Sequence, residues 1–247
     1  RTKSSAASDV YKRQHLDGDL KLLGNVFYSD YEDMQRTLFG FVGYRELDGQ
    51  AIYTLMTKNV PNSTIQGVEL EFDWKPYEAG RLFGWVSLLD TENGGSSSSE
   101  ATQDGYLCME RALVGVDPCN ADGTIDLSGK NLTWSPEKSW NLQFEHNTYT
   151  SNGFRIMNVI SANYTSEMFY NESNYASEPF HSGRDDLYTV NTSMVFIDEA
   201  NAWALEFYVH NATDELIKTD SYPANAGFVK AMYAPPMAYG VRFNKDF

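Results

Sequence analysis

The sequence contains few groupings of side chains that could carry out covalent chemistry. Its four histidines are scattered, and it contains neither a Gly-x-Ser-x-Gly turn nor a Gly-rich phosphate loop. Glu69 and Glu71 could form an acid–base pair, but their spacing also suits carboxylates along one polar face of a strand. We therefore expect the chain not to be an enzyme.

Metal and redox chemistry have two candidate segments. Cys108 and Cys119 stand in a Gly/Ser/Asp-rich stretch without the further Cys or His ligands of a zinc site, and we predict a loop disulfide rather than two free thiols. Segment 117–126 resembles a calcium loop, but Pro118 and Gly129 occupy the positions of its first and last acids. We expect an acidic turn and no metal or cofactor.

An aromatic cluster with Asn neighbours is the remaining candidate for ligand binding. It comprises Tyr164, Phe169, Tyr170 and Tyr175. These rings could stack against a sugar or a chelate ligand in a long loop, where binding residues concentrate. They could equally pack against one another as loop cover.

The composition excludes several classes of protein. The 247 residues include 34 acidic and 19 basic side chains, a net charge of −15 that would repel nucleic acid. No apolar run is long enough for a transmembrane helix. An aromatic share of 14% argues against disorder, because such residues need a surface to pack against.

The segments that must position these residues alternate apolar and polar side chains, which is typical of strands. Over 64–76, for example, Val68 and Leu70 alternate with Glu69 and Glu71. The sequence predicts eight strands, at 18–34, 64–76, 80–91, 139–149, 152–165, 187–198, 202–210 and 239–247. The fold class is therefore all-β.

Short and long connections alternate between these strands. They are long at 35–50, 92–137, 166–186 and 215–230, and short at 76–80, 150–153 and 198–201. This rhythm predicts an antiparallel up-and-down meander with all tight turns at one end, as in outer-membrane barrels. The aromatic-rich apolar face and the carboxylate-rich opposite face favour membrane outside and water inside.

The C-terminus adds a separate indication. Tyr239, Val241, Phe243 and the terminal Phe247 form an alternating apolar pattern. It looks like the terminal-strand signature by which the barrel-assembly machinery recognises outer-membrane barrels.

Four segments resemble the C-terminal barrel of TonB-dependent outer-membrane receptors. They are 62–71, 132–137, 208–215 and 235–243, and the resemblance extends over nearly all of 15–247. It implies about eight C-terminal strands of a transmembrane barrel of about 22 strands. It also implies a bacterial outer-membrane location, contact with outer-membrane lipid, and import of an iron chelate, cobalamin, glycan or peptide. The plug domain, through which a periplasmic energy-transducing protein would act, is absent from the sequence.

Two alternatives remain open at this point. One is a complete eight-stranded outer-membrane barrel that serves as an anchor or an enzyme, although its narrow interior would bury many unpaired carboxylates. The other is a secreted soluble β-domain that binds carbohydrate.

Residues 1–14 resemble a translated sequencing-adaptor scar, and we expect them to be non-native. Without them, 15 basic and 33 acidic residues remain and the net charge is −18. Residues 15–247 would then be the C-terminal part of the barrel.

Overall fold

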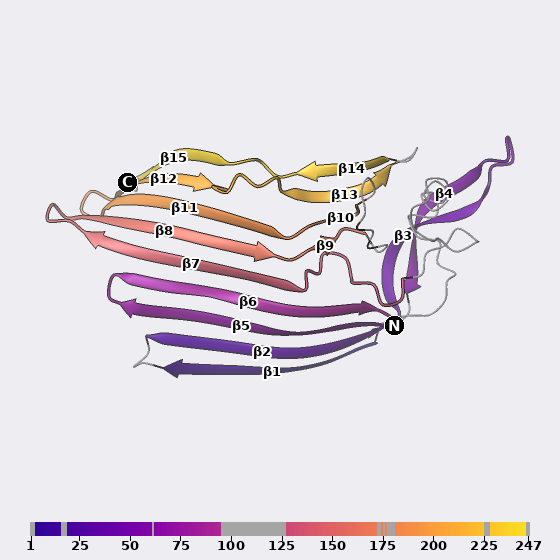
Figure 1. The fold of residues 1–247 in the computed structure, drawn as a ribbon, viewed down its shortest axis with the longest axis horizontal. Helices are drawn as coiled ribbons and strands as arrows, with labels where there is room; N and C mark the ends of the chain where they lie inside the picture. Colours follow the sequence, from indigo (N-terminus) through magenta and orange to yellow (C-terminus); the bar gives the residue numbers. More distant parts are fainter. Residues whose placement is uncertain are drawn as a thin grey trace.

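The computed structural model describes residues 3–15, 19–60, 62–94, 127–171, 174, 176, 181–224 and 228–245. Every regular element within these ranges is a β-strand, as the alternating sequence predicts (Figure 1). This part of the chain contains no helix that could cross a membrane.

Nine antiparallel strands form the main sheet of the described chain, in the order β1-β2-β5-β6-β7-β8-β11-β12-β15. They are β1 (Lys3–His15), β2 (Leu20–Glu32), β5 (Ser63–Tyr77), β6 (Gly80–Asn93), β7 (Lys138–Tyr149), β8 (Phe154–Thr165), β11 (Leu187–Asp198), β12 (Trp203–His210) and β15 (Ala238–Lys245). All eight predicted strands are confirmed. The ninth, β1, has no alternation in its sequence but pairs with β2 from Lys3 to His15.

The connections confirm the predicted meander. Tight turns join β5 to β6, β7 to β8 and β11 to β12 at one end of the sheet, which we call the turn end (Figure 1). The longer connections leave from the opposite end, which we call the loop end. Strands of this sheet that follow one another along the chain are also hydrogen-bonded neighbours, so the chain runs up and down without a crossover.

Three of the four long connections contain strands that the sequence did not predict. They contain the hairpins β3 (Met34–Tyr44) with β4 (Ala51–Val60), β9 (Met168–Phe169) with β10 (Gly183–Arg184), and β13 (Lys218–Ala224) with β14 (Phe228–Tyr233). In β3, consecutive apolar residues at 38–39 and 41–42 hide the period of two, and β9 is too short to show any period. In each ribbon the two strands pair with each other, which satisfies the backbone groups that face the partner strand.

The register places apolar and polar side chains in separate rows, because directly paired residues of antiparallel strands share a face. One row joins Leu70, Val86 and Trp140 across β5, β6 and β7. The adjacent row, on the other face, joins Glu71, Trp85 and Asn141. The alternation in the sequence therefore becomes one apolar face and one mainly polar face.

Aromatic side chains cluster at two levels of the apolar face. Toward the loop end, the Tyr164 ring lies 4.5 Å from that of Tyr188 and 5.9 Å from that of Trp140. Toward the turn end, the Trp203 ring lies 5.7 Å from Phe154 and 6.1 Å from Phe243.

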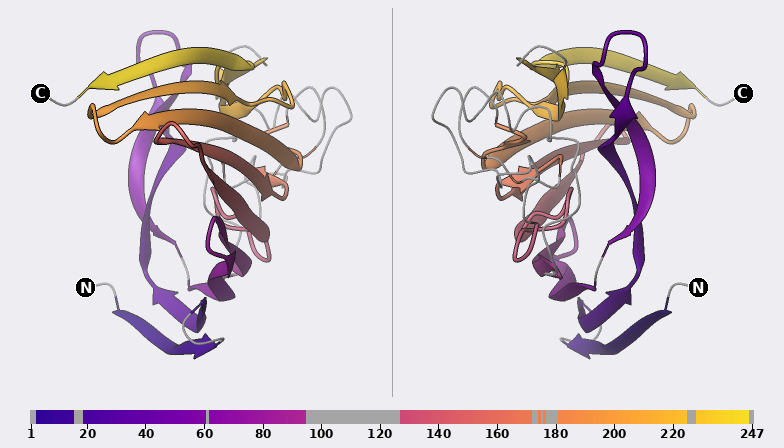
Figure 2. Two further views of the ribbon diagram at one scale, coloured as in Figure 1. Left: turned by 90° about the vertical axis from the view of Figure 1, so that its left-hand side faces the viewer. Right: turned by 90° about the vertical axis from the view of Figure 1, so that its right-hand side faces the viewer.

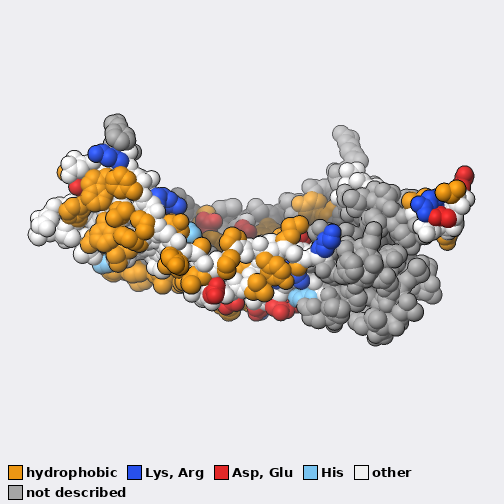
Figure 3. All heavy atoms as spheres, turned by 90° about the horizontal axis from the view of Figure 1, so that it is seen from above, with side chains coloured by type: hydrophobic (Ala, Val, Ile, Leu, Met, Phe, Trp, Pro, Cys, Tyr) orange, Lys and Arg blue, Asp and Glu red, His pale blue; other side chains and the backbone are white. Residues whose placement is uncertain are grey.

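The apolar face has no protein cover within the described residues. Val68 is 46% exposed, Phe207 45% and Val241 60%, whereas Leu132, Phe169 and Tyr170 are the only buried hydrophobic residues in the part of the chain that the structure describes. Figure 3 shows hydrophobic side chains gathered toward the turn end on the side that carries β15. A soluble β-sandwich would bury such a face against a second sheet, whereas the described residues leave this face exposed.

The sheet is curved but open. Strands β1 and β15 are its two outer strands and do not pair with each other (Figure 2). The alternative of a complete eight-stranded barrel is therefore wrong for the described chain, since such a barrel must close on itself.

Candidate functional site

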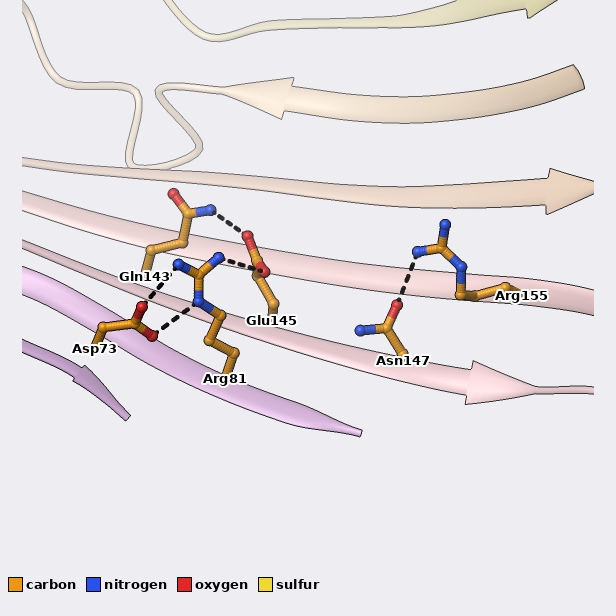
Figure 4. Close-up of polar contacts among 6 residues, drawn as sticks. All are labelled: Asp73, Arg81, Gln143, Glu145, Asn147 and Arg155. Atoms are coloured by element: carbon orange, nitrogen blue, oxygen red, sulfur yellow. Dashed lines mark hydrogen bonds and ion pairs between the residues drawn. The ribbon is translucent and has the colours of Figure 1, made fainter. Parts of the chain in front are cut away.

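The polar face carries an ion-pair network near the turn end. Arg81 at the start of β6 donates two hydrogen bonds to Asp73 of β5, at 2.9 and 3.0 Å, and lies 3.8 Å from Glu145 of β7 (Figure 4). Gln143 donates to the same Glu145 at 3.0 Å. The guanidinium thus links three neighbouring strands and neutralises two carboxylates.

Other polar groups on this face are paired in the same way. Arg242 of β15 contacts Glu206 of β12 at 2.7 Å, and Arg155 contacts the turn residue Glu199 at 3.1 Å. The amide of Asn141 donates to Asn163 at 2.7 Å. The sequence suggested many unpaired acids here, but register brings partners to several of them.

A depression of about 600 Å³ lies beside the network. Its lining includes Lys21, Glu71, Asp73, Arg81 and Trp85. The mixture of both charges with an aromatic ring can hold a polar protein surface or water, and it provides no nucleophile–base pair for catalysis.

The loop end holds the only hydrophobic core of the described chain, which we call the loop cluster: Leu132, Phe169 and Tyr170. The Tyr170 hydroxyl donates to the carbonyl of Lys218 at 2.5 Å and so links this cluster to β13. Burial raises the pKa of Tyr170 to about 12, and the nearby Asp220 acts in the same direction. At neutral pH the phenol is therefore a neutral hydrogen-bond donor.

Trp134 lies on top of the loop cluster. Its ring centroid is 4.7 Å from that of Tyr170, and its backbone N–H donates to the carbonyl of Phe169 at 2.9 Å. Its φ of 59° is left-handed, which is uncommon for a bulky residue, and the side chain is 54% exposed. The contact with Tyr170 therefore holds the exposed ring of Trp134 in one position.

Asn211 fastens the chain where β12 ends. It is buried with a φ of 50°, and its Oδ1 accepts from the Glu215 N–H at 3.1 Å and from the Thr213 hydroxyl at 3.2 Å. Its Nδ2 donates to the Glu215 carbonyl at 2.9 Å, and its own N–H donates to Oδ1 of Asn191 at 2.9 Å. One side chain therefore fixes the first turn of the loop.

The predicted aromatic ligand residues are dispersed. Tyr164 is not a loop residue but lies within β8, in the row of apolar side chains with Trp140 and Tyr188. Phe169 and Tyr170 are buried in the loop cluster, which agrees with the alternative of loop cover. Tyr175 lies outside the described residues.

The other predicted positions are placed only in part. Tyr239, Val241 and Phe243 alternate along β15 and are all exposed on the apolar face. Phe247, both cysteines Cys108 and Cys119, and the acidic segment 117–126 lie outside the described residues. The disulfide therefore stays a prediction.

One grouping was missed by sequence reasoning. Metal-ligating atoms of Glu167, His181 and Asp185 all lie within 4.8 Å of one another, around the β9–β10 ribbon. The histidines look scattered in the sequence, because the thirteen residues between Glu167 and His181 conceal that the two strands pair.

Comparisons with known proteins agree with this architecture. A family model described as "TonB dependent receptor-like, beta-barrel" matches residues 11–212. A search of curated proteins found no match.

Several solved structures resemble the chain. The ferric yersiniabactin uptake receptor FyuA from Yersinia pestis has a TM-score of 0.69 and 17% identity, covering 100% of this chain and 30% of that one. The siderophore receptor PiuA from Acinetobacter baumannii has a TM-score of 0.63 and 14% identity, covering 97% and 28%. The copper transporter OprC has a TM-score of 0.60 and 11% identity, covering 100% and 31%. At these identities the likeness shows a shared fold, and the chain spans less than a third of each structure.

Proposed function

This chain belongs to the TonB-dependent receptor-like β-barrel family, and from that premise we propose that it forms part of the wall of a receptor that captures a scarce nutrient at its extracellular loops and imports it by gated transport. The family and the similar structures are outer-membrane receptors and transporters, not enzymes. Uptake is a property of the whole receptor. This chain covers about 30% of the length of FyuA.

Trp134 is the observation that carries the ligand proposal. It offers an exposed aromatic surface at the loop end, held by Tyr170 beneath it. Flat aromatic faces suit planar or apolar parts of a chelate ligand. FyuA and PiuA are described as receptors for siderophores or their iron complexes, which favours an iron chelate as the cargo. OprC is described as a copper transporter, so the test must include that metal as well.

The experiment uses the full-length receptor that contains this chain, expressed in a bacterial host without its own ferric-siderophore receptors. Uptake of radioactive iron from a panel of ferric siderophores, and of copper, is measured with Trp134→Ala and Trp134→Phe. Because a stacked aromatic contact contributes about 1 kcal/mol, Trp134→Ala should raise the half-saturating concentration about fivefold to tenfold, while Trp134→Phe should raise it less.

A matched control is Tyr149→Ala, an exposed aromatic residue at the turn end. It should leave uptake of the same chelate unchanged. The proposal fails if no chelate in the panel is taken up, or if uptake persists in a host that lacks the periplasmic energy-transducing protein.

The two faces of the sheet support the remaining partners. Exposed apolar side chains such as Val68 and Val241 suit contact with outer-membrane lipid, while the Asp73–Arg81–Glu145 network suits a wet lumen that holds a polar plug domain. Through that plug the energy-transducing protein would act. The alternating pattern of Tyr239, Val241, Phe243 and the terminal Phe247 would be read by the barrel-assembly machinery during insertion.

We also propose that residues 1–14 are foreign to the receptor and that the barrel segment begins at residue 15. The register pairs Asp9 with Val26 and Arg13 with Leu22, which would put charged residue types in the apolar row. Amplifying the gene from its source DNA and reading across codons 1–14 tests this. An identical sequence continuing upstream in the genome would refute it.

A further inference from the structure

The β9–β10 ribbon brings two carboxylates together. Met168 pairs with Arg184, so Glu167 and Asp185 stand next to each other where the ribbon meets β8 and β11. Both side chains are exposed at the loop end. Carboxylates held this close repel each other, and a bound cation between them would remove that repulsion.

His181 completes the group from inside the loop. Its side chain is 7% exposed, its ring packs edge-on against Phe169 at 6.4 Å, and its backbone carbonyl accepts from Lys218 Nζ at 2.9 Å. Its Nε2 lies 4.0 Å from Oε1 of Glu167. The imidazole is therefore held beside the carboxylates by packing on its other side.

Neighbouring contacts also hold the backbone of the two acids. The Glu167 N–H donates to Oδ1 of Asp186 at 2.8 Å, and Oδ2 of Asp186 accepts from the Tyr164 hydroxyl at 2.9 Å. At Gly183, a Cβ would overlap the carbonyl of Met168, so the close pairing that positions Asp185 depends on glycine there. Asp186 thus serves the scaffold, while Glu167 and Asp185 keep carboxylates at the surface.

We propose that Glu167, His181 and Asp185 bind a divalent transition-metal ion of the zinc class. One imidazole nitrogen and two carboxylate oxygens suit zinc, whereas calcium prefers six to eight oxygen ligands. In a tetrahedral zinc site the ligand atoms lie about 3.3 Å apart, so the atoms of this group, which lie within 4.8 Å of one another, must approach by up to about 1.5 Å. The exposed carboxylate side chains can supply this movement.

The geometry leaves the fourth zinc position facing solvent. Three protein ligands with one open position can hold a water molecule or a donor atom from a second molecule. Binding would also tie the two ends of loop 166–186 together, because Glu167 and Asp185 lie one residue inside its two ends. The three ligands do not include Trp134, so this proposal does not depend on the proposed cargo.

The test uses the full-length receptor that contains this chain, in detergent micelles, titrated with zinc by calorimetry. An exposed three-ligand site should bind more weakly than a four-ligand zinc finger, with a Kd of about 1–100 µM and one ion per chain. Glu167→Gln and Asp185→Asn should each weaken binding at least about tenfold. Both residues are exposed, so these variants should keep the fold.

Matched controls are Glu46→Gln and His210→Gln, which change an exposed acid and a histidine outside the group. Neither should alter the affinity. X-ray absorption at the zinc edge should show one imidazole in the first coordination sphere of the unmutated protein. The His181→Ala variant should lack this imidazole.

Three results would overturn the proposal. The first is no saturable zinc binding below about 1 mM, the affinity expected of isolated surface carboxylates. The second is unchanged affinity in both Glu167→Gln and Asp185→Asn. The third is a coordination sphere with no imidazole, or with more than one.

Discussion

Replacing Asn211 separates two contributions to the order of the loop end. Its left-handed φ of 50° would cost alanine about 1 kcal/mol, whereas asparagine and glycine adopt this conformation readily. Its side chain makes two hydrogen bonds to the Glu215 backbone, each contributing about 1 kcal/mol. We expect Asn211→Gly to destabilise the loop by about 2 kcal/mol and Asn211→Ala by about 3 kcal/mol.

Hydrogen exchange measures this locally. In detergent micelles, mass spectrometry of a peptide that contains Ala212 and Glu215 reports the opening of the turn, because their N–H groups donate to Val190 and to Asn211. Since 1.4 kcal/mol corresponds to a factor of ten, exchange should accelerate about 30-fold in Asn211→Gly and about 150-fold in Asn211→Ala.

Asn152→Gly, in the exposed turn at 150–153, is the control and should leave this peptide unchanged. Equal exchange in Asn211→Gly and Asn211→Ala would refute the argument from the left-handed backbone. Unchanged exchange in both would refute the argument from the side-chain bonds as well.

Three further predictions follow from other parts of the structure. The pKa of Tyr170, about 12 when folded and near 10 when unfolded, means that its contribution to stability is complete below pH 10 and is lost as the pH rises through 12. The 295 nm absorbance of the chain minus that of Tyr170→Phe should titrate near pH 12, and a midpoint near 10 would contradict this. Ala202, exposed with a φ of 51°, should be replaceable by glycine with a gain of about 0.5 kcal/mol, seen as a higher urea midpoint; a lower midpoint would argue against strain there. Arg81→Met should lower the free energy of unfolding by about 1 kcal/mol or less in the same assay, because the ion pair with Asp73 is partly exposed. Arg81→Lys should recover only part of this loss. Full recovery would show that the two hydrogen bonds from the guanidinium to Asp73 are unimportant.

The main strands and the separation of their faces could be predicted from the sequence because a period of two is local information. Leu70 and Glu71 reveal their faces by their neighbours alone, and the register then confirms them. The short connections were equally visible, since turn residues interrupt the alternation at 150–153.

The site residues were harder to predict because they depend on register between segments. Arg81 has two acidic partners only because β5 and β7 flank β6 in the sheet. His181 approaches Glu167 only because a two-residue ribbon pairs across a long loop. Tyr164 illustrates a different error, since it was grouped with loop aromatics although it lies within the predicted strand 152–165 and within β8.

The two aromatic levels of the apolar face define a thickness. On β8, Phe154 and Tyr164 are ten residues apart, which is about 33 Å along a strand and about 23 Å along the membrane normal at a tilt of about 45°. This distance is close to the apolar band of about 25 Å found in outer-membrane barrels. In a bilayer with a core of about 30 Å, one aromatic level would be drawn into hydrocarbon or the lipid would have to thin. Hydrophobic matching would therefore favour a thin membrane and leave the loop cluster standing clear of it.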